Sequence, residues 1–576
     1  MFEVFILHNM EIAWSFYELA DLLEFKGDDF FKLRAYRNAA KTIAGLPEPV
    51  ERLYREKKLA KVPGIGKNIL AKIGELVATG KMEKLERLRR EIPGGVLEIM
   101  ALPGVGAKRA SIFYQQLGAA SLDQLLQAAR EHRIRALAGM GAKTELEIVR
   151  NIDILRNRAG SFLLGLARQL ADELTGFIKM LPEALKVEVA GSVRRWRETV
   201  GDLDILVASR EPEQVLDAVA LYPRTREILE RKRNIIKVAT WWGIPVEVAV
   251  VSPEQFWFAL LWNTGSKKHL EQLINLSLSK GFKLEPGGLS GNGHQALIPH
   301  SEGDIYSRLG LQYIPPELRE GRGEVEQADA HALPELLENG DIKGDLHLHS
   351  NWSDGGNSIG EIAARAREKG YSYIAVTDHS QSLKIARGLT PERLEEQYAL
   401  IDGLNGEYTD FTVLKGIEVD ILAGGGLDLP DQVLETADVV VASVHSGFRQ
   451  DPETITSRIL QAVESEHVDI IGHLTGRMLG QREGYAVDVE RVLEAAARHG
   501  KIMEINSSPD RLDLNDENVR LAREYGVKIA INTDAHDLKR LDEMEYGVAT
   551  ARRGGLESRD VVNTLELPEL LKILRR

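Results

Sequence analysis

The stretch GDLHLHS, residues 344–350, is the first of seven short apolar segments in the C-terminal part of the chain that each end in polar residues. The other six are YIAVTDHS (373–380), TVLKGIEVDI (412–421), VVVASVHS (439–446), VDIIGHLT (468–475), KIMEINSS (501–508) and VKIAINTDAH (527–536). Helical stretches such as SIGEIAARAREKG separate them. Strands that alternate with helices at this spacing form a parallel sheet, so we predict a closed barrel with its site at the C-terminal strand ends.

Side chains that bind metal ions collect at these strand ends. They are His347, His349, Asp354, His379, Glu418, His445, His473, Asp534 and His536. Oxygen and imidazole ligands suit Zn, Mn or Fe, and the chain has no cysteine that could serve instead. A lone buried histidine is more often structural than a ligand, and we interpret His467 and His499 in that way because both fall on helical or linking segments. Nine such residues at strand ends predict a metal site.

The size and composition of the chain describe a multidomain globular protein. Its 576 residues are too many for one hydrophobic core, so we expect roughly three or four folding units. No apolar run is long enough to span a bilayer. The opening MFEVFILH lacks the basic segment of a signal peptide, so we expect a cytoplasmic protein without a membrane partner.

Charge is distributed unevenly along the chain. The net charge is −14, yet residues 31–110 hold 18 Lys and Arg against 8 Asp and Glu, which leaves −24 for the remainder. This asymmetry indicates a nucleic-acid surface near the N-terminus attached to an acidic catalytic body. A solvated helix face is the alternative if charge is considered alone.

A short pattern recurs three times among helices with apolar periodicity between residues 10 and 160. Its copies are VPGIGKNILAKI (62–73), LPGVGAKRASIF (102–113) and LAGMGAKTELEI (137–148). Glycines allow a tight turn that presents backbone N–H groups to a phosphate at a helix N-terminus. The pattern resembles the helix-hairpin-helix motif of DNA repair proteins, although one copy alone would also fit an ordinary helix pair. The DNA-binding residues that it predicts are Gly64, Gly66, Lys67, Gly104, Gly106, Lys108, Gly139 and Gly141.

The middle of the chain carries a pair of carboxylates in the segment GDLDIL. Asp202 and Asp204 are two residues apart on an extended segment, so both project to one face and can bind two divalent cations. Upstream, Gly191 and Ser192 form a small turn whose backbone can hold a triphosphate. Arg194 and Arg195 add positive charge. The carboxylate pair alone would fit a surface strand, but the Gly-Ser turn favours a nucleotide site.

Several segments together resemble the family X DNA polymerases, and most closely the bacterial members that carry a second C-terminal domain. These segments are GSVRRWRETVGDLDIL (191–206), TGSKKH (264–269), YIPPELREGRGEVE (313–326) and the three hairpins. The resemblance implies a lyase-like domain, fingers, palm and thumb that act on gapped or primed DNA with dNTPs and Mg or Mn. It places Thr264, Gly265 and Ser266 at the nucleotide, and Lys72 at the Schiff-base lysine of lyase-active members.

The palm departs from the family pattern at its third carboxylate. The expected form is hydrophobe-Asp-hydrophobe-Arg, but VEVAVV (246–251) has Glu247 for Asp and Ala249 for Arg. The usual aromatic pair before Thr264 is Trp262 and Asn263, and Leu270 replaces a polar residue. Glutamate moves its carboxylate by about 1 to 1.5 Å relative to aspartate. Because phosphoryl transfer depends on accurate metal placement, we predict a weakened polymerase.

The C-terminal part resembles the PHP domain, named for polymerases and histidinol phosphatase, across residues 341–576. The resemblance implies that His347, His349, Glu418 and Asp534 bind one ion and that Glu418 bridges to a second. His445 and His473 would be the other ligands of the second ion. Asp354, His379 and His536 would bind a third ion. With two or three Zn, Mn or Fe ions, the implied activity is 3′-5′ exonuclease or phosphoesterase.

We therefore predict a multidomain α+β and α/β protein with helix-hairpin-helix domains, a nucleotidyltransferase palm and thumb, and a distorted (β/α)7 PHP barrel. The expected divisions are a lyase-like domain (1–90), fingers (91–160), palm (161–255), thumb (256–319), linker (320–340) and PHP domain (341–576). The predicted function is DNA repair by a monomer with polymerase and exonuclease sites. The alternative is an active nuclease whose polymerase region is a silent DNA-binding module. A small-molecule phosphatase would leave the three hairpins unexplained.

Overall fold

A computed structural model describes residues 9–44, 46, 48, 50–100, 102, 105–137, 140–141, 144–145, 148–149, 152, 161–222, 225–240, 243–291 and 297–574. The chain divides into two units, Met1–Ala159 and Gly160–Arg576. None of the described helices is both long and apolar enough to cross a membrane.

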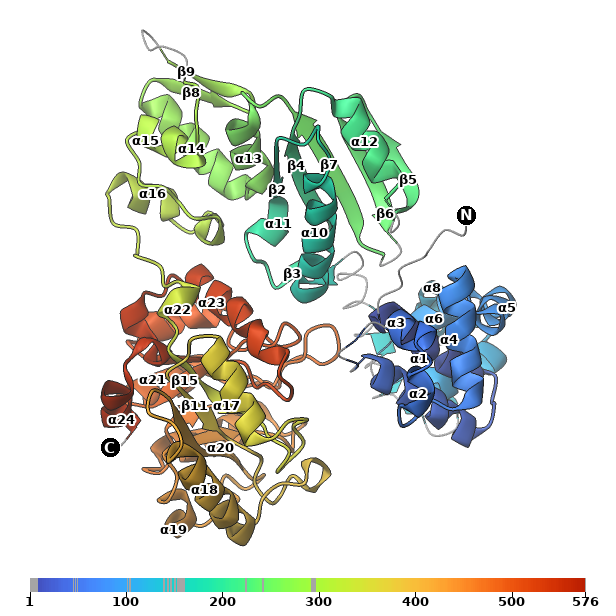
Figure 1. Cartoon of the computed structure of the whole chain (residues 1–576), viewed down its shortest axis with the longest axis vertical. Helices are drawn as coiled ribbons and strands as arrows, with labels where there is room; N and C mark the ends of the chain where they lie inside the picture. The colour runs from blue at the N-terminus through green and yellow to red at the C-terminus, as the bar shows by residue number, and fades with distance from the viewer. Residues whose placement is uncertain are drawn as a thin grey trace. The chain divides into compact units, whose positions relative to one another are not determined.

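Helices build the first unit (Figure 1). They are α1 (Asn9–Phe25), α2 (Phe30–Ala44), α3 (Val50–Arg55), α4 (Lys67–Thr79), α5 (Glu83–Glu91), α6 (Gly94–Met100), α7 (Gly106–Ile112) and α8 (Leu122–Arg130). Their apolar faces share one core that includes Phe16, Ile43, Ile73 and Phe113. No strand occurs among the described residues of this unit, which matches the helical periodicity of the sequence.

The second unit opens with a five-stranded palm sheet. Its order is β2 (Lys186–Val189), β4 (Leu203–Ala208), β7 (Pro245–Val251), β6 (Ile235–Thr240) and β5 (Thr225–Arg231), with β4 and β7 parallel and the other neighbours antiparallel. Helices α10 (Leu164–Lys179) and α12 (Pro212–Ala220) share a core with one face of this sheet. On the opposite face, α13 (Phe256–Thr264) packs against Leu206 and Ala208. Asp204 and Glu247 are half-buried and pair in register across β4 and β7.

The thumb follows the palm and extends beyond the range that the sequence predicts. Its elements are α13, α14 (Lys267–Ser279), β8 (Phe282–Glu285), β9 (Gly288–Gly291), α15 (Glu302–Arg308) and α16 (Glu324–Asp329). Helix α16 lies within the predicted linker 320–340, yet Val325 and Ala328 are buried in the thumb core. An apolar pair one helical turn apart explains this packing, so residues 324–329 belong structurally to the thumb.

Seven parallel strands form the sheet of the PHP part, as the sequence predicts. In spatial and chain order they are β10 (Gly344–Leu348), β11 (Tyr373–Val376), β12 (Thr412–Asp420), β13 (Val439–Ser443), β14 (Ile470–Ile471), β15 (Ile502–Asn506) and β16 (Ile529–Asn532). The sheet nearly closes, because the His349 amide donates to the Ala535 carbonyl (3.0 Å) just beyond β10 and β16. This seam brings the first and last strand ends together.

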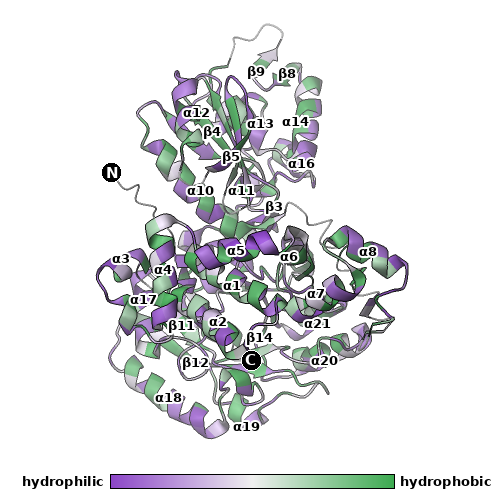
Figure 2. Cartoon of the chain, turned by 90° about the vertical axis from the view of Figure 1, so that its right-hand side faces the viewer, coloured by the Kyte–Doolittle hydropathy of each residue, from purple (hydrophilic) through white to green (hydrophobic). Residues whose placement is uncertain are grey.

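Helices surround the barrel strands. They include α17 (Ile359–Glu368), α18 (Pro391–Asn405), α20 (Pro452–Glu464), α21 (Val489–His499), α22 (Asp516–Glu524) and α23 (Met544–Arg553). Ser358 and Glu361 start α17 with a reciprocal capping box. The strands are mostly apolar in Figure 2, whereas α18 carries both hydrophilic and hydrophobic residues. Buried strands and amphipathic helices are the pattern expected of an α/β barrel.

Candidate functional site

The predicted metal ligands of the PHP part converge at the C-terminal ends of the barrel strands. Their ligand atoms form three overlapping groups, and within each group all atoms lie within 4.8 Å of one another. The groups are His349, Asp354, His379 and His536; His347, His349 and Asp534; and His379, Glu418 and His445. His473 joins them because its Nε2 lies 3.1 Å from Glu418 Oε1. The groups share His349 and His379. The first set that the resemblance implies is also close together, since His347 and His349 each lie 3.0 to 3.7 Å from both Glu418 and Asp534.

Several buried atoms of this cluster lack a hydrogen-bond partner among the described residues. They are His347 Nε2, His349 Nδ1 and Nε2, His379 Nδ1, Glu418 Oε2 and His473 Nδ1. Leaving so many buried polar atoms unpaired is costly, because each has lost its hydration. Imidazole and carboxylate atoms that face one another in this way fit a polynuclear metal site.

Electrostatics hold His349 and Glu418 in the forms that bind metal, whereas for His347, His445 and His536 the neighbouring carboxylates outweigh burial and raise the pKa of the ring. Burial, followed by His536 and His379, lowers the pKa of His349 to about 3. Burial alone would raise the pKa of Glu418, but His445 and His347 lower it well below its ordinary value. A neutral imidazole and an ionised carboxylate are the states that metal ions require.

Two further carboxylates orient the histidines, and the sequence analysis did not select them. His347 Nδ1 donates to Glu504 Oε1 (2.7 Å), and His445 Nδ1 donates to Asp420 Oδ1 (2.5 Å). These bonds leave Nε2 of each ring directed at Glu418, at 3.4 and 3.3 Å. Asp420 follows Glu418 by two residues, and Glu504 lies on β15, so both share the strand-end pattern that identified the ligands. Carboxylates in this role fix ring orientation and raise ligand basicity.

We expect Asp420→Asn to weaken metal binding roughly 10- to 100-fold, because His445 loses the charge that holds its Nδ1 proton. Equilibrium dialysis against Mn²⁺ would measure the change. Asp431→Asn is the matched control, since that carboxylate is 71% exposed in the same part of the chain. An unchanged Mn²⁺ affinity in Asp420→Asn would contradict the orienting role.

The palm carboxylates lie on neighbouring strands, but their oxygen atoms do not converge as closely as the ligand atoms of the PHP part. Within the described residues, the groups with ligand atoms inside 4.8 Å all belong to the PHP part. Burial, followed by the charges of Asp202 and Glu247, raises the pKa of Asp204 to about 7. The acidic groups therefore repel one another.

Lys237 supplies a positive charge at the palm carboxylates, and the sequence analysis missed it. It pairs in register with Glu247 across β6 and β7. Its Nζ lies 3.8 Å from Glu247 Oε2 and 3.9 Å from Asp202 Oδ2. The family pattern expects an arginine where Ala249 stands, so Lys237 brings a cation to the site from the adjacent strand. Only strand register reveals this neighbour.

The Gly-Ser turn packs directly against the carboxylates, as a nucleotide site requires. Gly191 has φ +59°, and a Cβ built there would lie 2.0 Å from Asp204 Oδ2. Glycine is therefore needed both for the left-handed backbone and for the close approach. Ser192 follows in the short helix α11 (Gly191–Arg194).

The two predicted phosphate-binding arginines are engaged in ion pairs. Arg194 donates to Thr264 Oγ1 (2.7 Å) and to both Glu302 oxygens (3.1 and 2.6 Å). Arg195 donates to the Thr264 carbonyl oxygen and to Glu320 Oε1 (3.1 Å). Gly265 lies beside the Arg195 guanidinium, and Ser266 caps α14. Arg194 and Arg195 therefore join the Gly-Ser turn to the Thr264–Ser266 segment.

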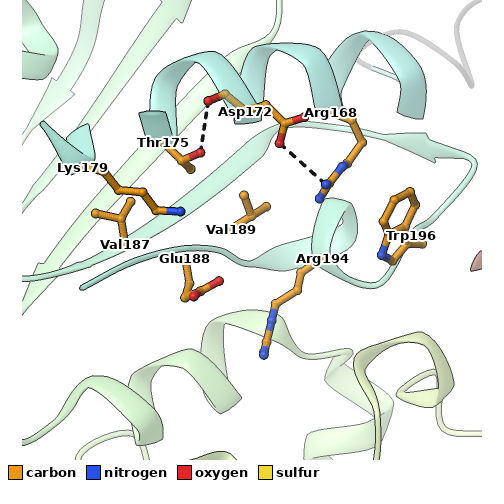
Figure 3. Close-up of a pocket in the computed structure, with 9 residues that line it drawn as sticks. All are labelled: Arg168, Asp172, Thr175, Lys179, Val187, Glu188, Val189, Arg194 and Trp196. Carbon is orange, nitrogen blue, oxygen red and sulfur yellow. Dashed lines mark hydrogen bonds and ion pairs between the residues drawn. The ribbon is translucent and has the colours of Figure 1, made fainter. Parts of the chain in front are cut away.

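A pocket between α10 and β2 lies beside Arg194 (Figure 3). It is lined by Arg168, Asp172, Thr175, Lys179, Val187, Glu188, Val189, Arg194 and Trp196. Arg168 stacks on the Trp196 ring at 4.5 Å and pairs with Asp172 at 3.6 Å, and the Arg194 guanidinium pairs with Glu302 at 2.6 Å. The pocket therefore adds no catalytic group.

The hairpin residues of the first unit are exposed where the structure describes them. Gly64, Gly66 and Lys67 are exposed at the start of α4, and Gly64 has φ +87°. Gly106 and Lys108 are exposed on α7, and Gly141 is exposed further along. Gly104 and Gly139 lie outside the described residues. Open backbone at these glycines would permit approach of a phosphate.

Lys72 is half-buried on α4 near two other lysines. Partial burial, followed by Lys32 and with a smaller contribution from Lys72, lowers the pKa of Lys84 to about 8. A lysine amine acts as a nucleophile in its uncharged form, which a lowered pKa favours. Lys84 is thus a second candidate that sequence reasoning missed, because its proximity to Lys32 depends on tertiary packing.

Family models match four stretches of the chain. They are a helix-hairpin-helix domain (residues 7–82), a SAM-like helix-hairpin-helix tandem (96–152), a DNA polymerase beta thumb (259–320) and a PHP domain (345–508). The matches confirm the predicted hairpins, thumb and PHP domain.

Relatives match either the whole chain or its PHP part. The DNA polymerase/3′-5′ exonuclease PolX of Bacillus subtilis (strain 168) is 38% identical over 575 residues, which are 99% of this chain and 100% of that protein. A probable phosphatase of Thermoanaerobacter sp. (strain X514) is 33% identical over 38% of this chain and 90% of its own length. A probable phosphatase of Syntrophotalea carbinolica is 30% identical over 38% and 92%.

Proposed function

Because the chain belongs to the family of bacterial DNA polymerase/3′-5′ exonucleases that includes PolX of Bacillus subtilis, we propose that it repairs DNA with both activities. The observation that carries the proposal is the convergence of the metal-ligand side chains at the barrel strand ends. Gapped or primed DNA and dNTPs are the proposed substrates. The relative covers the chain from the hairpins to the barrel, which favours a two-part enzyme over an isolated phosphatase.

The PHP part is the proposed exonuclease. Its histidines and carboxylates would hold two or three Zn, Mn or Fe ions, which supply activated water and stabilise charge on the leaving oxygen. Asp420 and Glu504 keep the ligand rings oriented. Arg511 Nε lies 3.8 Å from Asp534 Oδ2, so its guanidinium can bind a phosphodiester oxygen beside the ligands.

The palm is the proposed polymerase site, with Mg or Mn held by Asp202, Asp204 and Glu247. Gly191 and Ser192, together with Thr264–Ser266, would bind the nucleotide. We propose that its rate is low, because Glu247 has the longer side chain and Lys237 competes for the same carboxylates. The intact Gly-Ser turn against Asp204 supports retained nucleotide binding.

A silent DNA-binding module is the second candidate for residues 1–319. The separation of the palm carboxylates and the Lys237 ammonium beside them favour this alternative. The close packing of Gly191 on Asp204 opposes it, since a palm without nucleotide chemistry has no need for that contact.

One experiment separates the two candidates. A variant with His347→Ala and His349→Ala removes nuclease ligands, and it is then incubated with a gapped primer-template, dNTPs and Mn²⁺. Extension that disappears in Asp202→Asn and Asp204→Asn supports the polymerase. Absence of extension supports the silent module. In parallel, the unaltered chain should shorten the same primer from its 3′ end without dNTPs, and failure to do so would contradict the exonuclease.

The first unit is proposed to bind DNA backbone and to cleave abasic sites through Lys72. Borohydride should trap a covalent adduct between the chain and an abasic substrate, because a lysine amine forms a reducible Schiff base. Lys72→Ala should abolish the adduct, as seen by a band shift on a denaturing gel. Undiminished trapping in Lys72→Ala, with loss in Lys84→Ala, would instead assign the nucleophile to Lys84.

We also propose the division into lyase-like domain (1–90), fingers (91–160), palm (161–255) and thumb, with α16 added to the thumb. We propose that the protein is a monomer and that it acts in the cytoplasm.

A further inference from the structure

The loop that carries the Gly-Ser turn, residues 191–198 and here called the nucleotide turn, contacts the PHP part directly. The Trp196 ring meets the Tyr546 ring edge-on, with centroids 5.7 Å apart. Arg477 Nη2 donates to Glu198 Oε2 (2.6 Å). Both partners belong to the barrel half of the second unit, so the conformation of this turn depends partly on the hydrolase.

Arg553, at the end of α23, makes the most direct of these contacts. Its side chain is only 4% exposed. Nη1 donates to the backbone carbonyl of Arg195 (2.5 Å) and to Glu320 Oε1 (3.0 Å), and Nη2 donates to Asp516 Oδ2 (2.7 Å). A guanidinium can satisfy several acceptors at once from one rigid plane. Arg553 therefore anchors the backbone of the nucleotide turn to the barrel.

Glu320 connects Arg553 to the side chain of Arg195. Its Oε1 accepts from Arg195 Nε (3.1 Å) as well as from Arg553, and its Oε2 lies 3.5 Å from Arg197 Nη1. Glu320 is thus shared among three arginines. Because Arg553 uses part of the charge of Glu320, Glu320 holds Arg195 less strongly than it would in an isolated pair.

Arg195 lies where a triphosphate would need it. Its Nη1 donates to the Thr264 carbonyl, next to Gly265, while its own backbone continues from Gly191 and Ser192. The guanidinium therefore bridges the two segments that are proposed to bind nucleotide. To contact a triphosphate, it must give up part of its interaction with Glu320.

We propose that Arg553 of the PHP part is a positioning residue for nucleotide binding in the palm. It fixes the nucleotide turn through the Arg195 carbonyl, and it weakens the hold of Glu320 on the Arg195 side chain. The proposal rests on the proposed polymerase function. Without Arg553, the turn loses its anchor and Glu320 retains Arg195, and both effects weaken dNTP binding.

The test uses the full chain with His347→Ala and His349→Ala, bound to gapped DNA whose primer ends in a dideoxynucleotide. Without a 3′ hydroxyl no extension occurs, so titration with the next correct dNTP and Mn²⁺ reports binding alone. Arg553→Met should raise the dNTP dissociation constant roughly tenfold, the range of one charge-assisted hydrogen bond. Affinity for the gapped DNA itself should stay the same.

Two companion variants distinguish positioning from a general loss of structure. Arg553→Lys keeps the charge but cannot reach all three acceptors, so it should give an intermediate dissociation constant. Glu320→Gln combined with Arg553→Met should recover part of the dNTP affinity, because the carboxylate that retains Arg195 is neutralised. A purely structural role would predict further loss in this double variant.

Arg552→Met is the matched control. Arg552 donates to Glu317 Oε1 (2.8 Å) and to the Leu337 carbonyl (2.9 Å), and neither acceptor belongs to the nucleotide turn. It should leave the dNTP dissociation constant unchanged. Equal dNTP affinity in the unaltered chain and in both Arg553 variants would overturn the proposal, and so would an equal loss in Arg552→Met. If the chain that retains Arg553 binds no dNTP on gapped DNA, the proposed polymerase function is contradicted. The role of Arg553 in nucleotide binding is then contradicted as well.

Discussion

Replacing His349 by Ala should lower the rate of 3′-5′ degradation by roughly 10³-fold or more. His349 belongs to two of the three ligand groups, so its removal disturbs more than one ion. Loss of a metal-held charge costs several kcal/mol of transition-state stabilisation, and each 1.36 kcal/mol is tenfold in rate. The measurement is the shortening of a 5′-labelled oligonucleotide in Mn²⁺, followed on a sequencing gel.

His467→Ala is the matched control for His349→Ala. His467 lies in the same part of the chain but outside the ligand groups. Its Nε2 lies 3.9 Å from Asp431 Oδ1. The control should retain the degradation rate. A His349→Ala chain that degrades DNA normally, or a control that loses as much, would show that the exonuclease site lies elsewhere.

Replacing Glu247 by Asp should raise primer extension by roughly 100-fold in the chain with His347→Ala and His349→Ala. The shorter side chain returns the carboxylate to the position that the family pattern expects. It also moves the carboxylate away from Lys237, whose Nζ lies 3.8 Å from Glu247 Oε2. A displacement of about 1 Å in a reacting assembly can cost 10²-fold in rate, so its correction should recover a similar factor. Single-nucleotide insertion opposite a gap, with Mn²⁺, measures the change.

Two variants control the Glu247→Asp experiment. Glu230→Asp makes the same change on the exposed strand β5 of the palm sheet and should have no effect. Asp204→Asn, added to Glu247→Asp, should remove the gain because it disables a second ligand. Extension that is the same with Glu or Asp at position 247 would favour the silent-module interpretation.

The barrel and its ligands are predictable from sequence because the strands are short apolar runs, and all of them except β15 are followed by or contain a ligand residue. His347 and Glu418 stand out since their side chains are polar where the pattern is apolar. Asp420 and Glu504 are also carboxylates, but they bond to the Nδ1 atoms of ligand histidines. Local sequence does not distinguish a metal ligand from the group that orients it. The hairpins and thumb were likewise predictable from motifs, and family models match both.

Features that depend on register and long-range packing were not predictable. Lys237 reaches Glu247 only because β6 and β7 pair in one particular register. Glu320 accepts hydrogen bonds from both Arg195 and Arg553, which are far apart in the chain. Residues 320–340 are predicted to be a linker, yet Val325 and Ala328 complete the thumb core. Tertiary contacts, rather than local propensity, decide each of these cases.

The seam between β10 and β16 ties metal loading to folding. Backbone hydrogen bonding across the seam is supplemented by ligands from both sides, since His349 Nε2 lies 3.0 Å from Asp534 Oδ1. An ion held by both residues would join the first and last strands of the barrel. A ligand that binds only the folded state stabilises it in proportion to its occupancy. Chelation should therefore lower the unfolding temperature of the barrel as well as stop catalysis.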